Sequence, residues 1–385
     1  MPTQPPTSPD SGWHREGKAQ FRTESAFYRP YSQVGRDLAI LAAAVYRQRR
    51  GELRVLDAMT GCGVRPLRYQ LEAGADWVWA NEGNPEVHRV LSQNLAAGMR
   101  PRSYRLTQQD ANQLFFDCYQ QRDFYDLVDI DSFGSPVPFL STGLWATKIG
   151  GLLYLTSTDT RTTGGHNPER SIQAYGACAR AHPAVHEQGL RILIGSVLQQ
   201  AATKSMGVEP VFSLFNGQVH RVMVRLVMNQ AWPNDQYGFL GYCHRCGQFQ
   251  TLNWRQLGQA SCKICADQDI GLSISGPLWL GHLHNAAMLA EMEALAQTWG
   301  WSKRVKLLQL MQAESDLPPY FYRLGDIGRY GKMDIPPRDR LIYALRDRGY
   351  RATLTHLDFE AIKTDATLAT CIKIAGDIHN SRTNS

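Results

Sequence analysis

The chain has 385 residues, of which 43% are hydrophobic and 20% charged, so it is long enough for two globular domains and too apolar for wholesale disorder. It contains no run of eighteen apolar residues, which argues against a membrane span. The net charge is +6, and arginine outnumbers lysine by 32 to 9. Arginine suits bidentate phosphate contacts and stacking on bases, so the charge fits either a nucleic-acid-binding protein or a mildly basic enzyme.

The N-terminal segment is rich in Pro, Ser and Thr and lacks the charged-then-apolar pattern of a secretory signal. We expect residues 1–20 to form a disordered tail. The stretch from Gly35 toward Arg50 has the apolar spacing of an amphipathic helix. This helix would cover one face of a sheet, or Arg36 and Asp37 near its start would line a ligand cleft.

A glycine turn follows the first apolar strand. Val55-Leu56-Asp57 leads to Gly61 and Gly63, and residues 64–73 are predicted to form a helix. A strand, a glycine turn and a helix N-terminus in this order form a backbone cradle for a nucleotide-like ligand. The next strand, 77–81, ends at Glu82, whose carboxylate can bind both ribose hydroxyls of an adenosine. NAD and S-adenosylmethionine both fit, but Pro66 replaces the third glycine of the dinucleotide fingerprint.

Short apolar runs alternate with helix-length segments from Arg54 to Val227, which predicts an α/β domain with a mostly parallel sheet. The candidate strands are 54–57, 77–81, 104–107, 126–130, 151–157, 211–215 and 221–228. The candidate helices are 64–73, 85–97, 111–120, 137–147 and 184–206. The last two strands flank a loop that begins Asn216-Gly217 and form a hairpin. A closing hairpin is typical of class I methyltransferases and favours S-adenosylmethionine.

Asp110 follows the third strand. Its carboxylate can accept a hydrogen bond from the exocyclic amine of an adenine, and the backbone N–H of Ala111 can reach a ring nitrogen. Alternatively, Asp110 is the N-cap of the helix predicted over 111–120.

An acidic strand ends in a tight turn at residues 126–139. A carboxylate and a carbonyl that accept both hydrogens of an exocyclic amine make its nitrogen more tetrahedral, and an aromatic ring can stack on the base. Asp131, the Ser132 carbonyl and Phe133 have this chemistry in this order. The alternative is an ordinary strand end with Phe133 in the core. The polar, Gly-rich segment 161–168 is a candidate lid or RNA contact.

Four cysteines form two Cys-x2-Cys pairs whose spacing predicts a structural zinc site. The alternatives are a former metal site that no longer binds metal and a redox-active cysteine pair. They are Cys243, Cys246, Cys262 and Cys265. The other four cysteines are scattered, which predicts reduced thiols and a cytoplasmic protein. Helices are expected over 284–299 and 337–349, the second rich in arginine, and a strand over 350–356.

The chain resembles the tRNA (guanine-26 N2)-dimethyltransferases from Phe27 to about Ala366. The motifs that carry the resemblance are Phe27-Tyr28-x-Pro30, Arg36-Asp37-Leu38, Gly63-Val64-Arg65, Arg68-Tyr69, Asp131-x-Phe133-Gly134, Thr158-Asp159-Thr160, the four cysteines and Gly276-Pro277-Leu278-Trp279. The resemblance implies a class I methyltransferase domain followed by a C-terminal domain peculiar to the family.

The resemblance also implies roles for single residues. The implied cofactor contacts are Arg36, Arg65, Glu82, Asp110 and Ala111. Asp131 would hold the amine of a guanine swung out of its stack, and Phe27 and Phe133 would grip the base. Three features depart from the family: Ser132 replaces a usual proline, Glu82 replaces a common aspartate, and Arg29 and Gly35 stand where asparagine is frequent.

We therefore expect a monomeric tRNA methyltransferase that transfers methyl groups from S-adenosylmethionine to guanine N2. The expected organisation is a methyltransferase domain over 21–230 and a smaller, zinc-ribbon-containing α+β domain over 231–385 that binds tRNA. The sequence leaves open one methyl group or two, and whether guanine 27 is also modified. The alternatives are methylation of another amine, such as adenine N6 or a protein side chain, and a catalytically decayed RNA-binding module, which Ser132 would favour.

Overall fold

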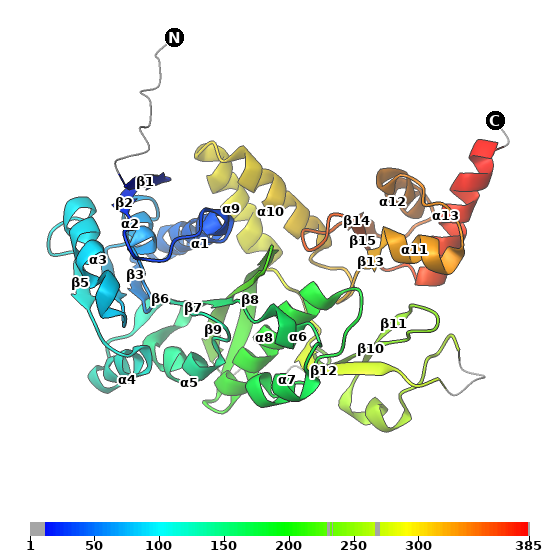
Figure 1. Cartoon of the computed structure of the whole chain (residues 1–385), viewed down its shortest axis with the longest axis horizontal. Helices are drawn as coiled ribbons and strands as arrows, with labels where there is room; N and C mark the ends of the chain where they lie inside the picture. The colour runs from blue at the N-terminus through cyan, green and yellow to red at the C-terminus, as the bar shows by residue number, and fades with distance from the viewer. Residues whose placement is uncertain (1–11, 229–231, 233, 266–269, 384–385) are drawn as a thin grey trace, which may run out of the picture. The chain divides into compact units, whose positions relative to one another are not determined.

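The computed structural model describes residues 12–228, 232, 234–265 and 270–383 (Figure 1). The chain forms two compact units, and each is described by itself. One comprises the chain up to Asp131 with Thr142–Tyr154, and the other comprises Ser132–Ser141 with the chain from Leu155 onward. The domain boundary expected at residues 230 and 231 lies outside the described residues.

Four parallel strands form the centre of the first unit. They are β3 (Arg54–Asp57), β4 (Trp77–Asn81), β5 (Tyr104–Thr107) and β6 (Tyr125–Asp131). The register places Val55 beside Val78 on one side and Leu127 on the other, so apolar side chains are aligned across the sheet. The same register places Asp57 beside Asp129.

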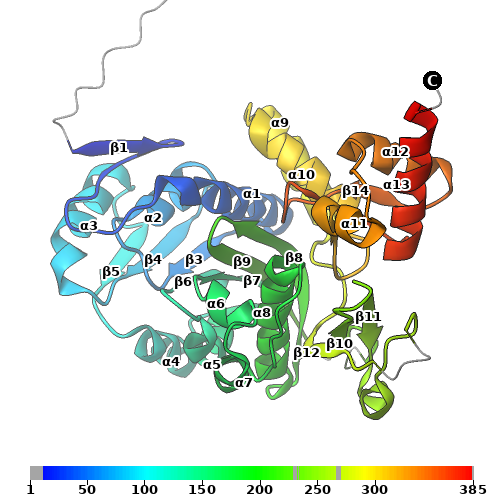
Figure 2. The same cartoon turned by 45° about the vertical axis from the view of Figure 1, so that its right-hand side comes forward.

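Helices cover both faces of these strands. They are α1 (Gln33–Arg50), α2 (Val64–Leu71), α3 (Pro85–Gly98) and α4 (Ala111–Gln121). Both views place α1, α2 and α3 on one face and α4 on the other (Figures 1 and 2). These helices and strands lie within a few residues of their predicted positions.

The complete sheet has seven strands in the order β5-β4-β3-β6-β7-β9-β8. The added strands are β7 (Thr147–Ser157), β8 (Met206–Asn216) and β9 (Val219–Met228), with α5 (Val137–Ala146) before β7. β8 and β9 are antiparallel, with an irregularity between Pro210 and Phe212. The sheet is therefore mixed, and the predicted α/β methyltransferase architecture with its closing hairpin is confirmed.

Part of the expected N-terminal tail is ordered. Strands β1 (Trp13–Glu16) and β2 (Ala19–Arg22) form an antiparallel hairpin. Its buried Glu16 binds Arg36 and Arg68, a pairing over long sequence distances that the composition of the segment does not reveal. The expectation of disorder up to residue 20 was therefore wrong for residues 13–20, while residues 1–11 lie outside the described chain.

The second unit continues with helices between the sheet strands. They are α6 (Thr160–Thr163), α7 (Pro168–Tyr175) and α8 (Val185–Ala202). Within the segment 161–168, which was expected to be a loop, residues 161–163 and 168 are helical and 164–167 remain a loop. Asp159 and Asn167 cap α6 and α7 through their side chains. Helix α8 packs against β8, β9 and β12 (Ser273–Trp279).

Two small antiparallel sheets complete the second unit (Figure 1). The first has the order β11-β10-β12, with β10 (Tyr237–Tyr242) and β11 (Phe249–Leu252). The second has the order β13-β15-β14, with β13 (Tyr322–Arg323), β14 (Ala352–Leu354) and β15 (Ala361–Thr364). The remaining helices are α9 (Ala286–Thr298), α10 (Ser302–Glu314), α11 (Leu324–Gly331), α12 (Arg338–Asp347) and α13 (Leu368–Thr383). Within the described ranges, no helix has the length and apolar character needed to cross a membrane.

Candidate active site and metal centre

The glycine turn lies between β3 and α2. Gly61 and Gly63 have φ values of 60° and 91°, a left-handed region that disfavours side chains. A Cβ on Gly63 would also lie 3.0 Å from Leu91 Cδ1. Cys62, between the two glycines, is buried, and its carbonyl accepts a hydrogen bond from Asn94 at 2.8 Å. The turn therefore requires glycine at Gly63 for both conformation and space, and Cys62 is a packing residue.

Glu82 is bound to this turn. Its Oε2 accepts a hydrogen bond from the Gly61 N–H at 2.8 Å, and its Oε1 accepts one from the Asn84 N–H at 2.9 Å. The side chain is half-buried at the end of β4. A carboxylate oxygen can accept more than one hydrogen bond, so Glu82 retains acceptor capacity for ribose hydroxyls.

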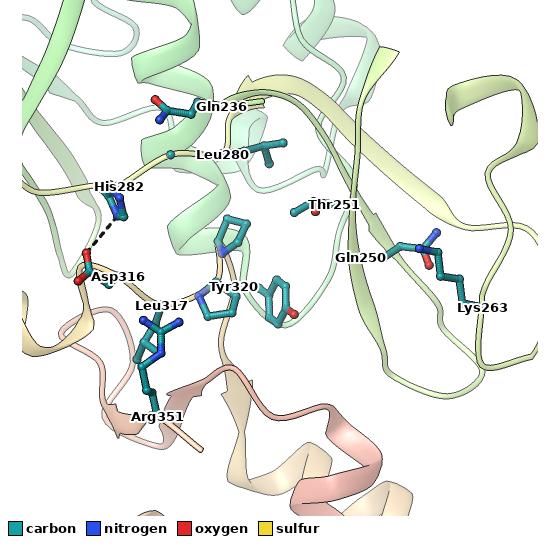
Figure 3. Close-up of a pocket in the computed structure, with 13 residues that line it drawn as sticks. Gln236, Gln250, Thr251, Lys263, Leu280, His282, Asp316, Leu317, Tyr320 and Arg351 are labelled. Atoms are coloured by element: carbon teal, nitrogen blue, oxygen red, sulfur yellow. Dashed lines mark ion pairs between the residues drawn. The ribbon is translucent and has the colours of Figure 1, made fainter. Parts of the chain in front are cut away.

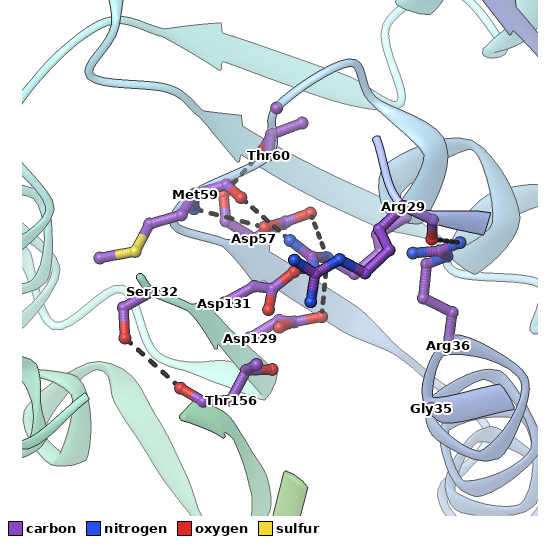
Figure 4. Close-up of polar contacts among 12 residues, drawn as sticks. Arg29, Gly35, Arg36, Asp57, Met59, Thr60, Asp129, Asp131, Ser132 and Thr156 are labelled. Atoms are coloured by element: carbon purple, nitrogen blue, oxygen red, sulfur yellow. Dashed lines mark hydrogen bonds and ion pairs between the residues drawn. The ribbon is translucent and has the colours of Figure 1, made fainter. Parts of the chain in front are cut away.

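Arg65, in the first turn of α2, forms ion pairs with three carboxylates, those of Asp57, Asp129 and Asp131, which are labelled in Figure 4. Its Nε lies 3.4 Å from Asp57 and 3.3 Å from Asp129, and its Nη1 binds Asp131. Its Nη2 donates to the Met59 carbonyl at 3.0 Å. The structure therefore brings two of the predicted site residues, Arg65 and Asp131, into direct contact, and adds Asp57 and Asp129 to them.

The three carboxylates differ in burial. Asp57 and Asp129 are fully buried, whereas the Asp131 side chain is 24% exposed. Burial raises the pKa of Asp57 to about 7, although the nearby Arg65 opposes the shift. A proton can therefore reside on Asp57 near neutral pH, and only Asp131 among the three has appreciable access to solvent.

Arg36 is buried in α1, and its hydrogen bonds go to residues other than these three carboxylates. Its Nε donates to Glu16 Oε1 at 2.7 Å, and its Nη2 donates to the Arg29 carbonyl at 3.2 Å. The Tyr28 hydroxyl donates to the same Glu16 carboxylate at 2.9 Å. Sequence reasoning did not identify Glu16, because nothing in its neighbourhood signals a partner for an arginine twenty residues later.

Asp110 and Ala111 stand at the start of α4. The Asp110 carboxylate accepts a hydrogen bond from the Gln113 N–H at 3.1 Å, which is the N-cap arrangement named as the alternative. Asp110 is exposed and Ala111 is buried. The cap occupies Oδ1, so a second role in binding adenine remains a prediction.

The turn that follows Asp131 belongs to the second unit and is held by the end of β7. The Ser132 hydroxyl donates to the Thr156 carbonyl at 3.4 Å, and the Gly134 N–H donates to Thr158 Oγ1 at 2.8 Å. Phe133, between them, is 74% exposed and does not belong to the core. In the first unit Phe27 is 59% exposed, with the Arg29 guanidinium carbon 5.4 Å from the centre of its ring. Both phenylalanines therefore present aromatic surface outward.

The four cysteines of the two Cys-x2-Cys pairs converge at one point. All four sulfur atoms lie within 4.8 Å of one another, and Cys246 Sγ lies 3.5 Å from Cys262 Sγ. Tetrahedral zinc with Zn–S bonds of about 2.3 Å separates its sulfur ligands by about 3.8 Å. The donor set and the spacing therefore fit one zinc ion.

A second group of potential metal ligands, His284, Glu314 and His356, was not foreseen. His356 binds Glu314 through Nδ1, and His284 Nε2 lies 3.7 Å from the same carboxylate oxygen. The Nδ1 atom of His284 accepts a hydrogen bond from the Ser213 N–H at 3.2 Å, so the neutral ring carries its hydrogen on Nε2. That nitrogen then has no lone pair for a metal, and we interpret this group as a buried hydrogen-bond network.

Comparison with known proteins identifies the family. Residues 13–375 match the model of the N2,N2-dimethylguanosine tRNA methyltransferase family. The tRNA (guanine(26)-N(2))-dimethyltransferase of Thermococcus kodakarensis is 31% identical over 359 residues, covering 88% of this chain and 90% of the relative. The enzyme of the same name from Archaeoglobus fulgidus is 30% identical over 362 residues, covering 93% and 97%.

A solved structure gives the same result. Trm1 from Pyrococcus horikoshii, in complex with S-adenosyl-L-methionine, superposes with a TM-score of 0.81 at 26% identity, covering 94% of this chain and 99% of that one. The similarity in sequence and in fold thus extends over nearly the whole chain. The chain belongs to the N2,N2-dimethylguanosine tRNA methyltransferase family.

Proposed function

We propose that this chain methylates the exocyclic N2 of guanine 26 in tRNA, adding one methyl group and then a second, with guanine 27 as a further acceptor. Family membership supports an S-adenosylmethionine-dependent tRNA (guanine-N2)-methyltransferase. The assignment of Asp131 as the residue that holds the amine rests on one observation. Its carboxylate ends a central strand, is bound by Arg65 and is 24% exposed.

The residues around the glycine turn fit S-adenosylmethionine. The left-handed glycines leave the turn without side chains, so a ligand can approach its backbone closely. We assign Glu82 to the ribose hydroxyls because its carboxylate already orients the Gly61 N–H at this turn. Asp110 and Ala111 are assigned to the adenine, and Arg36 and Arg65 to the polar end of the cofactor.

Asp131 and the Ser132 carbonyl would prepare the amine. The lone pair of guanine N2 is delocalised into the ring, which makes the nitrogen a poor nucleophile. Two acceptors that hold its hydrogens favour a more tetrahedral nitrogen with an available lone pair. S-adenosylmethionine, when bound, supplies an electrophilic methyl group. The Asp131 carboxylate would take the proton that N2 loses, and in the second round one hydrogen remains on N2 to be held.

Phe27 and Phe133 are assigned to the guanine itself. A base must leave its stack before its amine can reach a carboxylate on the protein, and aromatic rings compensate part of the lost stacking. The exposure of both rings supports this assignment. Arg29 near the Phe27 ring adds a planar cation that can also stack on a base.

We further propose that residues 21–230 form the methyltransferase domain and residues 231–385 a zinc-binding domain that holds tRNA. The convergence of four cysteine sulfurs supports a structural zinc, because four thiolates complete its tetrahedral shell. A cytoplasmic location and a monomeric state complete the proposal. Light scattering of the purified protein would test the second.

The reaction is tested with purified protein, S-adenosylmethionine and an unmodified tRNA transcript. Nucleoside mass spectrometry should detect N2-methylguanosine first and N2,N2-dimethylguanosine later. Transcripts with adenosine at position 26 or at position 27 locate the acceptors, and each should lose only its own product. Label transferred to DNA or to protein, with none to tRNA, would contradict the proposal and favour methylation of another amine.

The role of Asp131 is tested with Asp131→Asn. The amide keeps the shape but cannot accept a proton as a carboxylate does, so turnover should fall at least about a hundredfold. The matched control is Asp123→Asn, in the loop before the same strand, where the carboxylate binds Arg54 at 2.7 Å. Full activity of the Asp131 variant would refute the assignment. Tight calorimetric binding of S-adenosylmethionine to the wild type, lost in Glu82→Ala, would contradict a decayed RNA-binding module.

A further inference from the structure

A cavity of about 570 Å³ opens in the second unit between the sheet of β10 and β11 and the segment that follows α10 (Figure 3). No residue of this cavity belongs to the assigned reaction. Its volume lies within the range of sites that hold small organic ligands. The side chains that give it chemical character are Gln236, Thr251, Lys263, His282, Tyr320 and Arg351.

Two cations face this cavity. The Nε atom of Arg351 donates to Asp365 Oδ2 at 2.9 Å, and the Arg351 backbone N–H donates to Asp365 Oδ1 at 2.9 Å. This carboxylate holds the guanidinium in place, while the two Nη groups have no partner in the described part of the chain and the side chain is 60% exposed. Lys263 directly follows Cys262 of the cysteine cluster, and its ammonium pairs with no carboxylate of the described residues.

The rest of the wall is aromatic and amide-rich. The Tyr320 ring stacks on Phe249 with a centroid separation of 4.8 Å and an interplanar angle of 12°, which makes it a rigid surface. The side chains of Gln236 and Thr251 have no hydrogen-bond partner within the described ranges. Such amides and hydroxyls can donate to and accept from the edge of a base or a ribose.

One carboxylate reduces the positive charge of the cavity. Asp316 Oδ1 lies 3.4 Å from His282 Nδ1, which also donates to the Ser315 carbonyl at 2.8 Å. Asp316 is therefore oriented toward an imidazole, whereas Lys263 and Arg351 remain available to an anion. A nucleotide carries a phosphate and a flat base whose edge donates and accepts hydrogen bonds. A cavity with a cation, an aromatic ring and an amide side chain matches these groups.

We propose that this cavity binds one unpaired nucleotide of the substrate tRNA, with the phosphate on one side of the nucleotide at Arg351 and the phosphate on its other side at Lys263. The inference rests on the proposed function and deepens it, because it places a second contact with RNA outside the reaction centre. The base would lie toward Tyr320 and the polar groups of Gln236 and Thr251. Free nucleoside monophosphates share this chemistry, so the test separates the two sources.

The test compares the double variant Lys263→Ala/Arg351→Ala with the double variant Lys303→Ala/Arg348→Ala. The control removes the same two charges from exposed positions that do not line the cavity. Affinity for an unmodified tRNA transcript is measured directly between about 50 and about 200 mM salt. Two lost phosphate contacts on a single strand should reduce the salt slope of log K by about 1.4 and weaken binding about tenfold. Equal affinity and equal slope in the two variants would overturn the proposal.

Two further measurements complete the design. At saturating tRNA the cavity variant should methylate at the wild-type rate, with a raised KM for tRNA. If the wild type itself forms no methylguanosine, the proposed function fails. If the wild type is active and the KM of the variant is unchanged, only the proposal for the cavity fails. AMP binding that is lost in the variant while tRNA affinity stays unchanged would overturn the assignment to tRNA. If replacing Lys263 releases zinc, Arg351→Gln alone should reduce the salt slope by about 0.7, and an unchanged slope would overturn the proposal.

Discussion

Replacing Glu16 with glutamine should destabilise the N-terminal hairpin and the arginines beneath it. The Glu16 side chain is 1% exposed and accepts hydrogen bonds from Arg36 at 2.7 Å, Arg68 at 2.7 Å and Tyr28 at 2.9 Å. Arg68 keeps Glu72 and Asp37 as partners at 2.8 and 2.7 Å. Arg36 loses the carboxylate to which it is bound.

The magnitude follows from this difference between the two arginines. Removing one partner of a buried ion pair typically costs about 3–5 kcal/mol. Because Arg68 retains two carboxylates and glutamine still accepts one hydrogen bond, we expect the lower end, about 3 kcal/mol. If the hairpin opens locally, this value corresponds to roughly a hundredfold loss of amide protection in β1 and β2, at about 1.4 kcal/mol per factor of ten.

Hydrogen–deuterium exchange of residues 13–22 measures this loss. The control is Glu24→Gln, which removes a carboxylate paired with Arg89, whose side chain is 76% exposed. An exposed pair contributes less than about 1 kcal/mol, so the control should exchange nearly as the wild type does. If the two variants exchange at the same rate, the buried pair does not stabilise the hairpin and the reasoning is refuted. A weaker affinity for S-adenosylmethionine in the Glu16 variant alone would support the assignment of Arg36 to the cofactor.

Three further predictions concern the metal, pH and the acid cluster. Cys262→Ser should release zinc and lower stability, whereas Cys178→Ser, outside the cluster, should keep the full metal content by mass spectrometry. Burial lowers the pKa of His182 to about 4, below its usual 6.5, so the unfolded chain takes up the proton first as the pH falls. Stability present above pH 6.5 should then be lost toward pH 4, by about 2 kcal/mol at pH 5, and urea unfolding of His182→Asn should lack this share. Asp57→Asn should lower the free energy of unfolding by less than about 1 kcal/mol in urea at pH 7, because burial raises the pKa of Asp57 to about 7. A decrease of more than about 3 kcal/mol would show that the fold needs the charge of Asp57.

The central strands could be predicted because each is an apolar run bounded by turn residues. The predicted ranges 54–57, 77–81 and 104–107 coincide with β3, β4 and β5. The predicted strand 211–215 is the end of a longer β8, which also contains Pro210 and crosses an irregularity after it. Proline removes a ladder hydrogen bond and argues against a strand, so the sequence pattern was misleading there.

The N-terminal hairpin and α10 could not be predicted from local patterns. Each hairpin strand has only four residues, and the hairpin is held by long-range contacts: the ion pairs of Glu16, the burial of Phe21, and the hydrogen bonds between the Arg22 backbone and Asn94. Helix α10 mixes basic and apolar residues without a regular stripe, and only Leu308, Met311 and Glu314 are buried. In both cases the decisive contacts join residues far apart in sequence. Lys363, which binds Glu187 at 2.6 Å across 176 positions, is a further example.

The sequence was sufficient to select single site residues at the ends of strands and helices. It was not sufficient to predict which charged side chains contact one another. Asp131 and Arg65 could be selected singly, since one ends an acidic strand and the other opens the helix after the glycine turn. Their direct contact follows from the register of β3 and β6, which places Asp57 beside Asp129. Alternate residues of a strand share a face, so Asp131 lies on the same side as Asp129. No pattern in the sequence states this register.

This register determines what the proposed acceptor can do. One guanidinium faces three carboxylates, so ionisation of all three would leave two buried negative charges uncompensated, which is costly in a low-dielectric interior. Burial raises the pKa of Asp57 and so favours its protonated form, which relieves part of that cost at a fully buried position. Arg65 can then bind Asp131 and orient it without competition from a fully ionised Asp57. The carboxylate at the solvent-accessible end of the cluster is therefore positioned by the buried ones, and a substitution at any of them should affect catalysis through Arg65.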